Sequence, residues 1–206
     1  MKIAIVDSGI HAGHPHVGAV AGGTAFTEDG PGEDYIDRLG HGTAVAGAIR
    51  EKAPDAELFA VKIFDRRLSA GIESIVRALA WCAEQRMDIV NLSLGTANAE
   101  HRDRFVHVLT DDTVVVSVAG MLPGTIGGVI AVAPEDCPRD VFRYRDGVFY
   151  ASPQPRSIPG VPPERNLQGP SFAVANMTGF AAQALASVGA RDLRGELIER
   201  ARARSR

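Results

Sequence analysis

The chain has 206 residues, of which 45% are hydrophobic and 23% are charged, and its formal net charge is −3 at pH 7. A chain of this length and composition is expected to form one soluble domain over residues 1–206, with a full hydrophobic core. The nearly neutral charge gives no electrostatic reason to expect binding to nucleic acid or to an anionic membrane surface.

Predicted strands and helices alternate along the chain. In chain order they are a strand at 3–6, a helix at 41–49, a strand at 58–64, a helix at 72–85, a strand at 89–92, a helix at 102–109, strands at 114–118 and 129–132, and helices at 171–188 and 196–206. The strands are short apolar runs, as in buried parallel sheets. Residues 152–163 contain five prolines and are expected to form an extended loop. The alternation predicts an α/β fold in which helices cover both faces of a parallel sheet.

The sequence contains no predicted targeting or membrane segment. The first apolar stretch is short, contains Lys2, ends at Asp7 and lacks a small-residue cleavage site, so it is not a signal peptide. Elsewhere, no apolar run approaches the roughly 20 residues of a membrane helix. Two cysteines, Cys82 and Cys137, are too few for a disulfide framework, and Cys82 is expected to be a buried thiol. If Met1 is the natural start, these features predict a cytoplasmic protein without a pro-region.

Three short motifs contain the residue types of a serine nucleophile mechanism. They are Asp7-Ser8-Gly9, Gly40-His41-Gly42-Thr43 and Gly169-Pro170-Ser171. In such a mechanism the serine attacks, the histidine takes its proton, and the carboxylate orients the histidine. Asp7 is expected at the carboxyl end of a parallel strand, and Ser171 at a helix N-terminus that favours negative charge. A turn aspartate, a partly buried histidine and a helix-capping serine are the alternatives.

Five segments together carry a family resemblance, at residues 3–9, 41–47, 58–62, 88–95 and 169–179. In this order and spacing they resemble the sequence blocks of the subtilisin-like serine protease family. The resemblance implies a subtilisin-like three-layer sandwich with a mainly parallel central sheet. It also implies a serine endopeptidase in which Asp7, His41 and Ser171 are catalytic. The alternative is an unrelated α/β domain with chance small-residue turns.

The resemblance also assigns segments to substrate binding. Ser93, Leu94 and Gly95 resemble the strand that pairs with the substrate backbone, which is a form of β-augmentation. The segment after the central strand is assigned to the substrate in the same way, through Val118, Ala119 and Gly120. The expected partner is therefore an extended peptide or protein substrate. No cofactor is expected, and the sequence identifies no partner protein.

The predicted oxyanion region, Ser171 and Met121, departs from the family pattern. The family presents Ala-Gly-Asn after its central strand, and this asparagine donates to the oxyanion. Here Met121, which has no donor, follows Gly120. The residue before the serine, commonly threonine in the family, is Pro170, which has neither hydroxyl nor N–H. The backbone N–H of Ser171 remains as a predicted donor.

These departures predict a slow endopeptidase of narrow specificity. Cleavage of a leader from a modified peptide precursor is one setting that fits, and transpeptidation is another enzymatic outcome. The alternative function is a catalytically impaired module that binds a peptide or protein.

The sequence predicts no metal site. Three histidines lie close together, at His11, His14 and His16, but no nearby cysteine or carboxylate completes a ligand set. An acidic run fits no EF-hand spacing and is expected to be a solvated loop. Its members are Glu28, Asp29, Glu33, Asp34 and Asp37. The segment between 49 and 58 is too short for the long calcium-binding loop of the secreted subtilisins.

Overall fold

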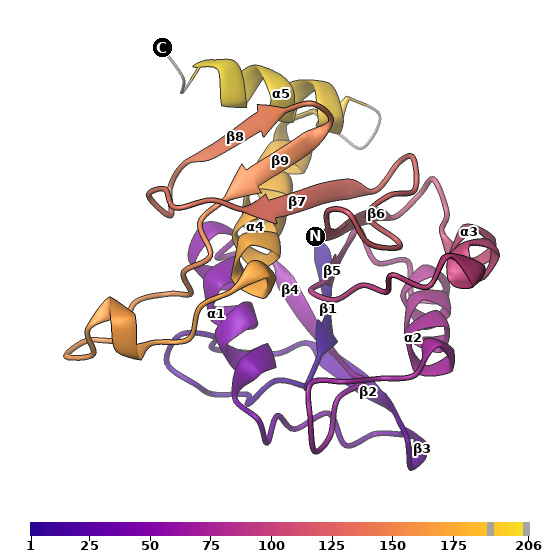
Figure 1. Cartoon of the computed structure of the whole chain (residues 1–206). Helices are drawn as coiled ribbons and strands as arrows, with labels where there is room; N and C mark the ends of the chain where they lie inside the picture. Colours follow the sequence, from indigo (N-terminus) through magenta and orange to yellow (C-terminus); the bar gives the residue numbers. More distant parts are fainter. Residues whose placement is uncertain (189–191, 204–206) are drawn as a thin grey trace.

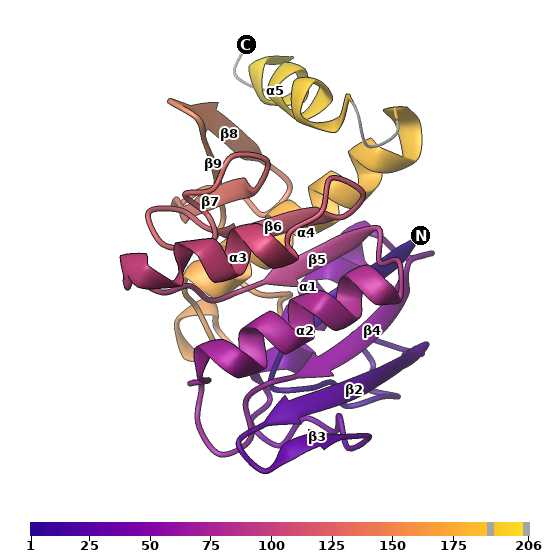
Figure 2. The same cartoon turned by 90° about the vertical axis from the view of Figure 1, so that its right-hand side faces the viewer.

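A central β-sheet runs through the molecule, with helices on both of its faces (Figures 1 and 2). The computed structural model describes residues 1–188 and 192–203. Within them the strands are β1 (Lys2–Asp7), β2 (Gly22–Thr27), β3 (Gly30–Gly32), β4 (Glu57–Lys62), β5 (Ile89–Leu92), β6 (Val114–Val118), β7 (Ile130–Pro134), β8 (Phe142–Arg145) and β9 (Val148–Ala151). The helices are α1 (His41–Lys52), α2 (Ile72–Glu84), α3 (Arg102–Val108), α4 (Pro170–Val188) and α5 (Leu193–Ala203), with short 3-10 helices η1 (Ala99–His101) and η2 (Pro163–Arg165).

The sheet is mainly parallel, as predicted. Its strand order is β3-β2-β4-β1-β5-β6-β7-β9-β8. Pairing is parallel from β2 across to β9, whereas the two edge pairs, β2–β3 and β8–β9, are antiparallel. The parallel centre explains the near-continuous apolar runs of the predicted strands, because both faces of such a sheet are buried.

Two hydrophobic clusters lie on opposite faces of this sheet. In β1, Ile3 and Ile5 belong to the cluster shared with α1, α4 and α5, while Ala4 and Val6 belong to the one shared with α2 and α3. Successive side chains of a strand point to opposite faces, so one short strand serves both clusters. Figure 2 shows α2 and α3 in front of the sheet, with α1 and α4 behind it. The predicted three-layer α/β architecture is therefore confirmed.

Every predicted strand and helix is present, with ends shifted by a few residues. The last predicted helix begins earlier, at Leu193, and residues 204–206 of that prediction lie outside the described residues. The proline-rich segment is free of helix and strand up to η2, in agreement with the expected loop. In agreement with the expected solvated loop, Glu28 and Asp29 are exposed in the turn between β2 and β3, and Glu33 and Asp34 are exposed after β3.

Candidate active site

Four segments of the chain meet at the carboxyl edge of the sheet. β1 ends at Asp7, and its parallel neighbour β5 leads into Ser93. Helix α1 begins with His41 beside Asp7, and α4 begins one residue before Ser171, beside Ser93. Ligands of open α/β sheets bind at this edge. The structure thus brings the predicted residues Asp7, His41 and Ser171 together there.

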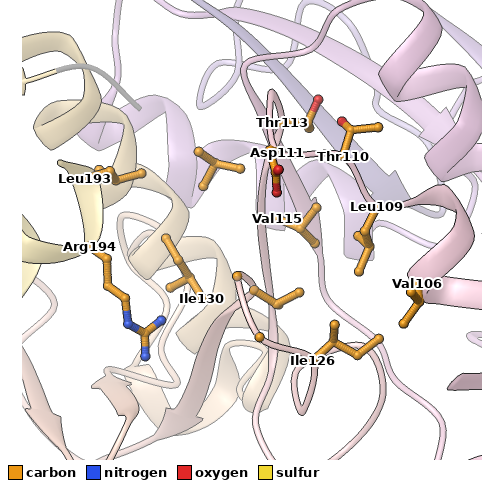
Figure 3. Close-up of a pocket in the computed structure, with 14 residues that line it drawn as sticks. Val106, Leu109, Thr110, Asp111, Thr113, Val115, Ile126, Ile130, Leu193 and Arg194 are labelled. Carbon is orange, nitrogen blue, oxygen red and sulfur yellow. The ribbon is translucent and has the colours of Figure 1, made fainter. Parts of the chain in front are cut away.

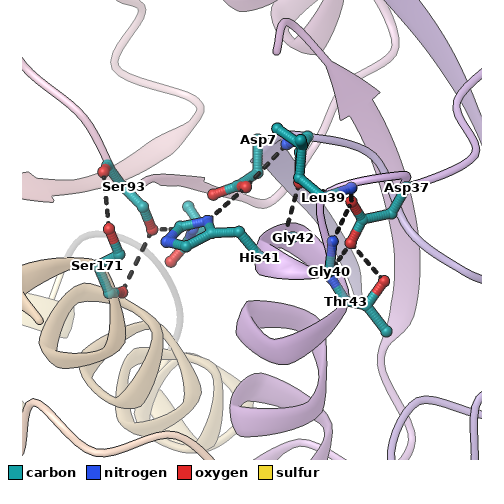
Figure 4. A network of polar contacts seen from close by, with 11 residues as sticks. Asp7, Asp37, Leu39, Gly40, His41, Gly42, Thr43, Ser93 and Ser171 are labelled. Carbon is teal, nitrogen blue, oxygen red and sulfur yellow. Dashed lines mark hydrogen bonds and ion pairs between the residues drawn. The ribbon is translucent and has the colours of Figure 1, made fainter. Parts of the chain in front are cut away.

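A short hydrogen bond links the acid and the histidine. Asp7 is fully buried, and its Oδ1 atom lies 2.7 Å from Nδ1 of His41 (Figure 4). The same oxygen accepts the backbone N–H of Ser8 at 2.8 Å. The other oxygen, Oδ2, is buried without a hydrogen-bond partner among the described residues. This pairing fixes the imidazole through Nδ1 and leaves Nε2 for proton exchange.

The surroundings of His41 adjust its basicity. Burial lowers the pKa of its imidazole, but the hydrogen bond to Asp7 and the charges of Asp7 and Asp37 outweigh burial and raise the pKa above its ordinary value. A base with a raised pKa accepts a proton more readily, yet it is neutral only at a correspondingly higher pH.

Gly42 allows α1 to approach the turn after β1 closely. A Cβ atom at this position would collide with the carbonyl oxygen of Gly9. The backbone N–H of Gly42 also donates to Ser8 Oγ at 2.9 Å. The small residues around Asp7 and His41 therefore let the two motifs lie in direct contact.

Asp37 supports the start of α1, and the prediction that it lies in a solvated loop is wrong. It is only 8% exposed. Its Oδ1 accepts from Leu39 N, Gly40 N and Ser8 Oγ, each at 2.9 Å. Its Oδ2 accepts from N and Oγ1 of Thr43 at 2.8 and 2.6 Å. Gly40, the N-cap residue, has no side chain to cap the helix, so Asp37 provides the acceptor that the first turn needs.

Ser171 lies at the N-terminal end of α4 and contacts Ser93. Its hydroxyl donates to the carbonyl oxygen of Ser93 at 3.3 Å, and Ser93 Oγ donates to the carbonyl oxygen of Ser171 at the same distance. Ser93 Oγ also accepts from Asn91 Nδ2 at 2.8 Å. The next residue, Phe172, lies with its ring centroid 5.5 Å from that of His41. The hydroxyl proton of Ser171 thus points to Ser93. The imidazole of His41 lies on the other side of the same site.

The two predicted substrate-binding segments lie next to each other. Leu94 O accepts from Ser117 Oγ at 3.1 Å. Beyond Gly95, Thr96 forms an antiparallel bridge with Leu122, with two backbone hydrogen bonds of 2.9 Å. Residues 118–120 continue from β6, where the N–H of Ala119 donates to Val132 O at 2.8 Å. This direct connection between the two segments was not predicted from the sequence.

Met121 packs on the first of these segments. A Cβ atom at Gly95 would lie 2.8 Å from the Cβ of Met121 and 3.6 Å from its sulfur. The thioether has no hydrogen to donate. In this position the chain therefore provides packing rather than a side-chain donor.

Two pockets border the edge that carries these residues. One, of about 240 Å³, includes Phe64, Leu68, Ile72 and Leu94 in its lining. The other, of about 530 Å³, extends from the start of α1 to the proline-rich loop. A third pocket, of about 290 Å³, lies near the amino ends of β6 and β7, at the opposite edge of the sheet, with Asp111 and Arg194 among its lining residues (Figure 3).

Other predicted features have separate outcomes. The Cys82 side chain is buried, as predicted, and burial raises the pKa of its thiol. Among the described residues, no cluster of three or more histidine, cysteine or acidic side chains has the arrangement of a metal site. The same residues include no helix with the length and apolarity needed to cross a membrane.

The chain is similar in sequence to a known protein family and to several of its members. Residues 1–133 match the sequence model of the subtilase family, peptidase S8. Subtilisin NAT from Bacillus subtilis subsp. natto is 30% identical over 187 residues, which cover 84% of this chain and 47% of the relative. An intracellular serine protease from Paenibacillus polymyxa is 36% identical over 107 residues, covering 46% of this chain and 33% of the relative. The chain thus spans less than half the length of either relative.

A solved structure shows the same fold. Sphericase has a TM-score of 0.76 to this chain, with 24% sequence identity over 98% of this chain and 83% of the other. At this identity the likeness concerns the arrangement of strands and helices.

Proposed function

Because the chain belongs to the subtilase family, we propose that it is a serine endopeptidase with Asp7, His41 and Ser171 as its catalytic residues. The observation that carries this proposal is the 2.7 Å hydrogen bond between the buried Asp7 carboxylate and His41, next to a serine at a helix start. The names of the matched relatives, a subtilisin and a serine protease, support the same chemistry.

In the proposed reaction, Ser171 Oγ attacks the carbonyl carbon of the scissile bond while His41 Nε2 takes the hydroxyl proton. Asp7 stabilises the resulting imidazolium. His41 then gives the proton to the leaving amine, the C–N bond breaks, and an acyl ester remains on Ser171. Water attacks this ester with His41 again as base. In the free protein the Ser171 hydroxyl donates to the carbonyl oxygen of Ser93. The hydroxyl therefore has to turn toward His41 before the imidazole can take its proton.

We also propose that the reaction is slow and narrow in specificity. The side chain at position 121 cannot donate to the oxyanion, and the residue before Ser171 is a proline without an N–H. In subtilisin, removal of its oxyanion-hole asparagine lowers kcat by about 10²–10³. The backbone N–H of Ser171, at the positive end of α4, supplies the remaining stabilisation in this proposal.

Substrate selection in the proposal depends on an extended backbone. The peptide pairs with Ser93, Leu94 and Gly95 and runs beside residues 118–120. The pocket at Leu94 accepts a substrate side chain on the acyl side of the scissile bond. Narrow selection suits a single peptidase domain over residues 1–206 that acts in the cytoplasm, for example on a peptide precursor.

A fluorophosphonate probe tests the proposed nucleophile. The probe should label the wild-type protein at Ser171, and Ser171→Ala and His41→Ala should each abolish labelling. The labelling rate should rise with pH through the pKa of His41, because only the neutral imidazole accepts the proton. Since Asp7 raises this pKa, the midpoint should lie above the ordinary histidine value of about 6.5.

Two outcomes would contradict the proposal. Labelling that persists in Ser171→Ala would identify a different nucleophile. A folded wild-type protein that is not labelled after long incubation would favour the alternative, a catalytically impaired module that binds a peptide or protein.

A further inference from the structure

The 530 Å³ cavity lies between the start of α1, which carries His41, and the segment that leads into α4 and Ser171. One side is formed by Gly40 and Thr43, which flank His41 in the sequence. The other includes Asn166 and Leu167, a few residues before Ser171. In Figure 4, Ser93 and Ser171 lie to one side of His41, and Gly40 and Thr43 lie to the other. Through Gly40 and Thr43, the cavity therefore lies on the side of His41 that faces away from Ser93.

This position corresponds to the leaving-group side of the scissile bond. The acyl part of the substrate is proposed to pair with residues 93–95, none of which lines the cavity. The leaving amine receives its proton from His41, so the chain that follows the scissile bond passes the imidazole. An extended peptide advances about 3.3 Å per residue, so its first few residues after the bond reach into this region.

Two arginines give the cavity its charge. Arg156, in the proline-rich loop, is half-buried, and its Nη1 donates to the carbonyl oxygen of His16 at 3.2 Å. Arg165 is exposed on η2 at the same cavity. Among the ion pairs found within residues 1–188 and 192–203, none includes either guanidinium. Both remain available to a carboxylate that enters from outside.

The acidic residue in the cavity lining does not fill this role. Asp37 is buried, and its two oxygens already accept the hydrogen bonds of Ser8, Leu39, Gly40 and Thr43. These bonds hold the carboxylate against α1, so it is not free to move to an arginine.

The histidines of the cavity do not gather around a metal. Nδ1 of His14 accepts the backbone N–H of His16 at 3.2 Å, and the two rings meet edge to face. Burial lowers the pKa of His16, and the charge of Arg156 lowers it further. The lowered pKa disfavours a positive charge on His16, whereas the two guanidinium groups keep their charge near neutral pH.

We infer that this cavity binds a substrate carboxylate on the leaving-group side and selects peptides that are acidic just after the scissile bond. The inference rests on the proposed endopeptidase function and specifies its substrate. The carboxylate belongs either to an aspartate or glutamate side chain or to the C-terminus of a short leaving peptide. Arg156 and Arg165 are its specificity-determining residues, since a guanidinium pairs with a carboxylate through two parallel hydrogen bonds.

An acyl-transfer experiment tests the leaving-group side without knowledge of the natural substrate. p-Nitrophenyl acetate acetylates Ser171 and releases p-nitrophenol, and an added peptide amine then competes with water for the acyl group. The amine attacks the ester, forms an N-acetyl peptide, and regenerates Ser171. The added peptides are Ala-Ala-Ala amides with glutamate at the first, second or third position, each matched by glutamine and lysine. Ala-Ala-Ala with a free carboxyl terminus tests the other source of the carboxylate.

The expected readout is the ratio of N-acetyl peptide to acetate. For at least one position, or for the free carboxyl terminus, the acidic peptide should exceed its neutral match by about fivefold. Arg156→Gln combined with Arg165→Gln should remove this preference. Arg165→Glu should shift it toward the lysine peptide. Arg77→Gln combined with Arg102→Gln, exposed arginines on α2 and α3, is the control with the same change in net charge.

Two results would overturn the inference, and they can be told apart. If p-nitrophenol is released in a burst but acidic and neutral peptides transfer equally, the carboxylate site is wrong and the endopeptidase proposal stands. The same holds if the preference survives the double glutamine variant. If no acyl ester forms on Ser171, the proposed function fails and the inference fails with it.

Discussion

The side chain of Met121 affects both the packing of the predicted substrate strand and the proposed stabilisation of the oxyanion. Met121 lies against Gly95, and the Thr96–Leu122 bridge holds their segments together. The contact stabilises the local packing of the predicted substrate strand. In the proposed alignment, it also places a group that cannot donate where the family has an amide.

Met121→Asn should raise the rate of acylation. A side-chain donor at this position would stabilise the developing oxyanion, with an upper limit of about 2.7–4 kcal/mol. A partial gain is expected, because the Thr96–Leu122 bridge constrains how the new side chain points. The gain should appear mainly in kcat, as for an interaction made only in the transition state. Single-turnover acylation by p-nitrophenyl acetate measures it.

Met121→Leu is the matched control, because it keeps the size of the side chain and adds no donor. Its acylation rate should stay close to that of the wild-type protein. Pro170→Thr should add a smaller gain that is not additive with Met121→Asn, because both would serve one oxygen. If Met121→Asn folds but acylates no faster, the alignment of Met121 with the oxyanion asparagine is wrong.

The sequence motifs predicted three residues that the structure brings together at the sheet edge, but not the residues that support them. Asp7, His41 and Ser171 stand in short motifs whose chemistry can be recognised without coordinates. Asp37 lies in a run of acidic residues and gives no such signal by composition. Its one sequence signal is its place just before a helix that starts with a glycine cap, where an acidic acceptor is favoured. The mutual contact of Ser93 and Ser171 joins segments far apart in sequence and could not be predicted.

Among the elements, the contact between α1 and α4 sets the positions of His41 and Ser171. The helices pack tightly at Gly179, where a Cβ atom would lie 2.7 Å from the Cβ of Lys52. Polar bonds reinforce this contact, since Gln183 Nε2 donates to the carbonyl oxygen of Lys52 at 2.8 Å. The spacing of the two helices therefore depends on a residue without a side chain.

Gly179→Ala should destabilise the protein by about 1–3 kcal/mol, because the added methyl group overlaps the stem of Lys52. Urea unfolding measures the change. Gly195→Ala is the matched control, since Gly195 also lies in a helix but has nothing within 4 Å of an added Cβ. This control should gain about 0.5–1 kcal/mol from helix propensity alone. Equal effects of the two substitutions would show that the helices tolerate a wider spacing.

The central strands and the edge strands differ in how well the sequence predicts them. β1, β5 and β6 are apolar runs because helices cover both of their faces. The edge strand β3 is Gly-Pro-Gly, whose residues are unfavourable in strands, and it forms only by pairing with β2. The hairpin of β8 and β9 did carry a signal. Its turn residues, Asp146 and Gly147, have φ of 50° and 86°, and Asp-Gly is typical of such two-residue turns.

At the scale of the whole molecule, one buried polar network joins the α1 and α4 layer to the loop that leads to Ser171. Lys52 Nζ donates to Asn176 Oδ1 at 2.7 Å. The amide nitrogen of Asn176 donates to the carbonyl oxygens of Ser152 and Gln154, each at 2.9 Å. The loop is thus anchored to the core at its start. Its remaining residues can form the wall of the arginine-lined cavity without losing their connection to the sheet.

This network should make the stability of the whole protein depend on pH in the alkaline range. Burial, together with the charge of Arg139, lowers the pKa of Lys52 to about 8 from an ordinary 10.5. Between these two pH values the unfolded chain holds a proton that the folded chain has released, so the free energy of unfolding rises with pH. The rise from this residue should be of the order of 3 kcal/mol in total.

Comparison of the wild-type protein with Lys52→Met isolates this contribution. Urea unfolding at a series of pH values from neutral to above 10.5 gives the difference in unfolding free energy between the two proteins. That difference should grow in favour of the wild-type protein over this range, because the variant has no proton to release at position 52. Lys2→Met is the control for the loss of one positive charge, because Lys2 is more exposed than Lys52. A difference that stays constant with pH would show that Lys52 keeps its charge within the network, held by Asn176 and by Glu51, whose Oε2 lies 3.5 Å from the ammonium group.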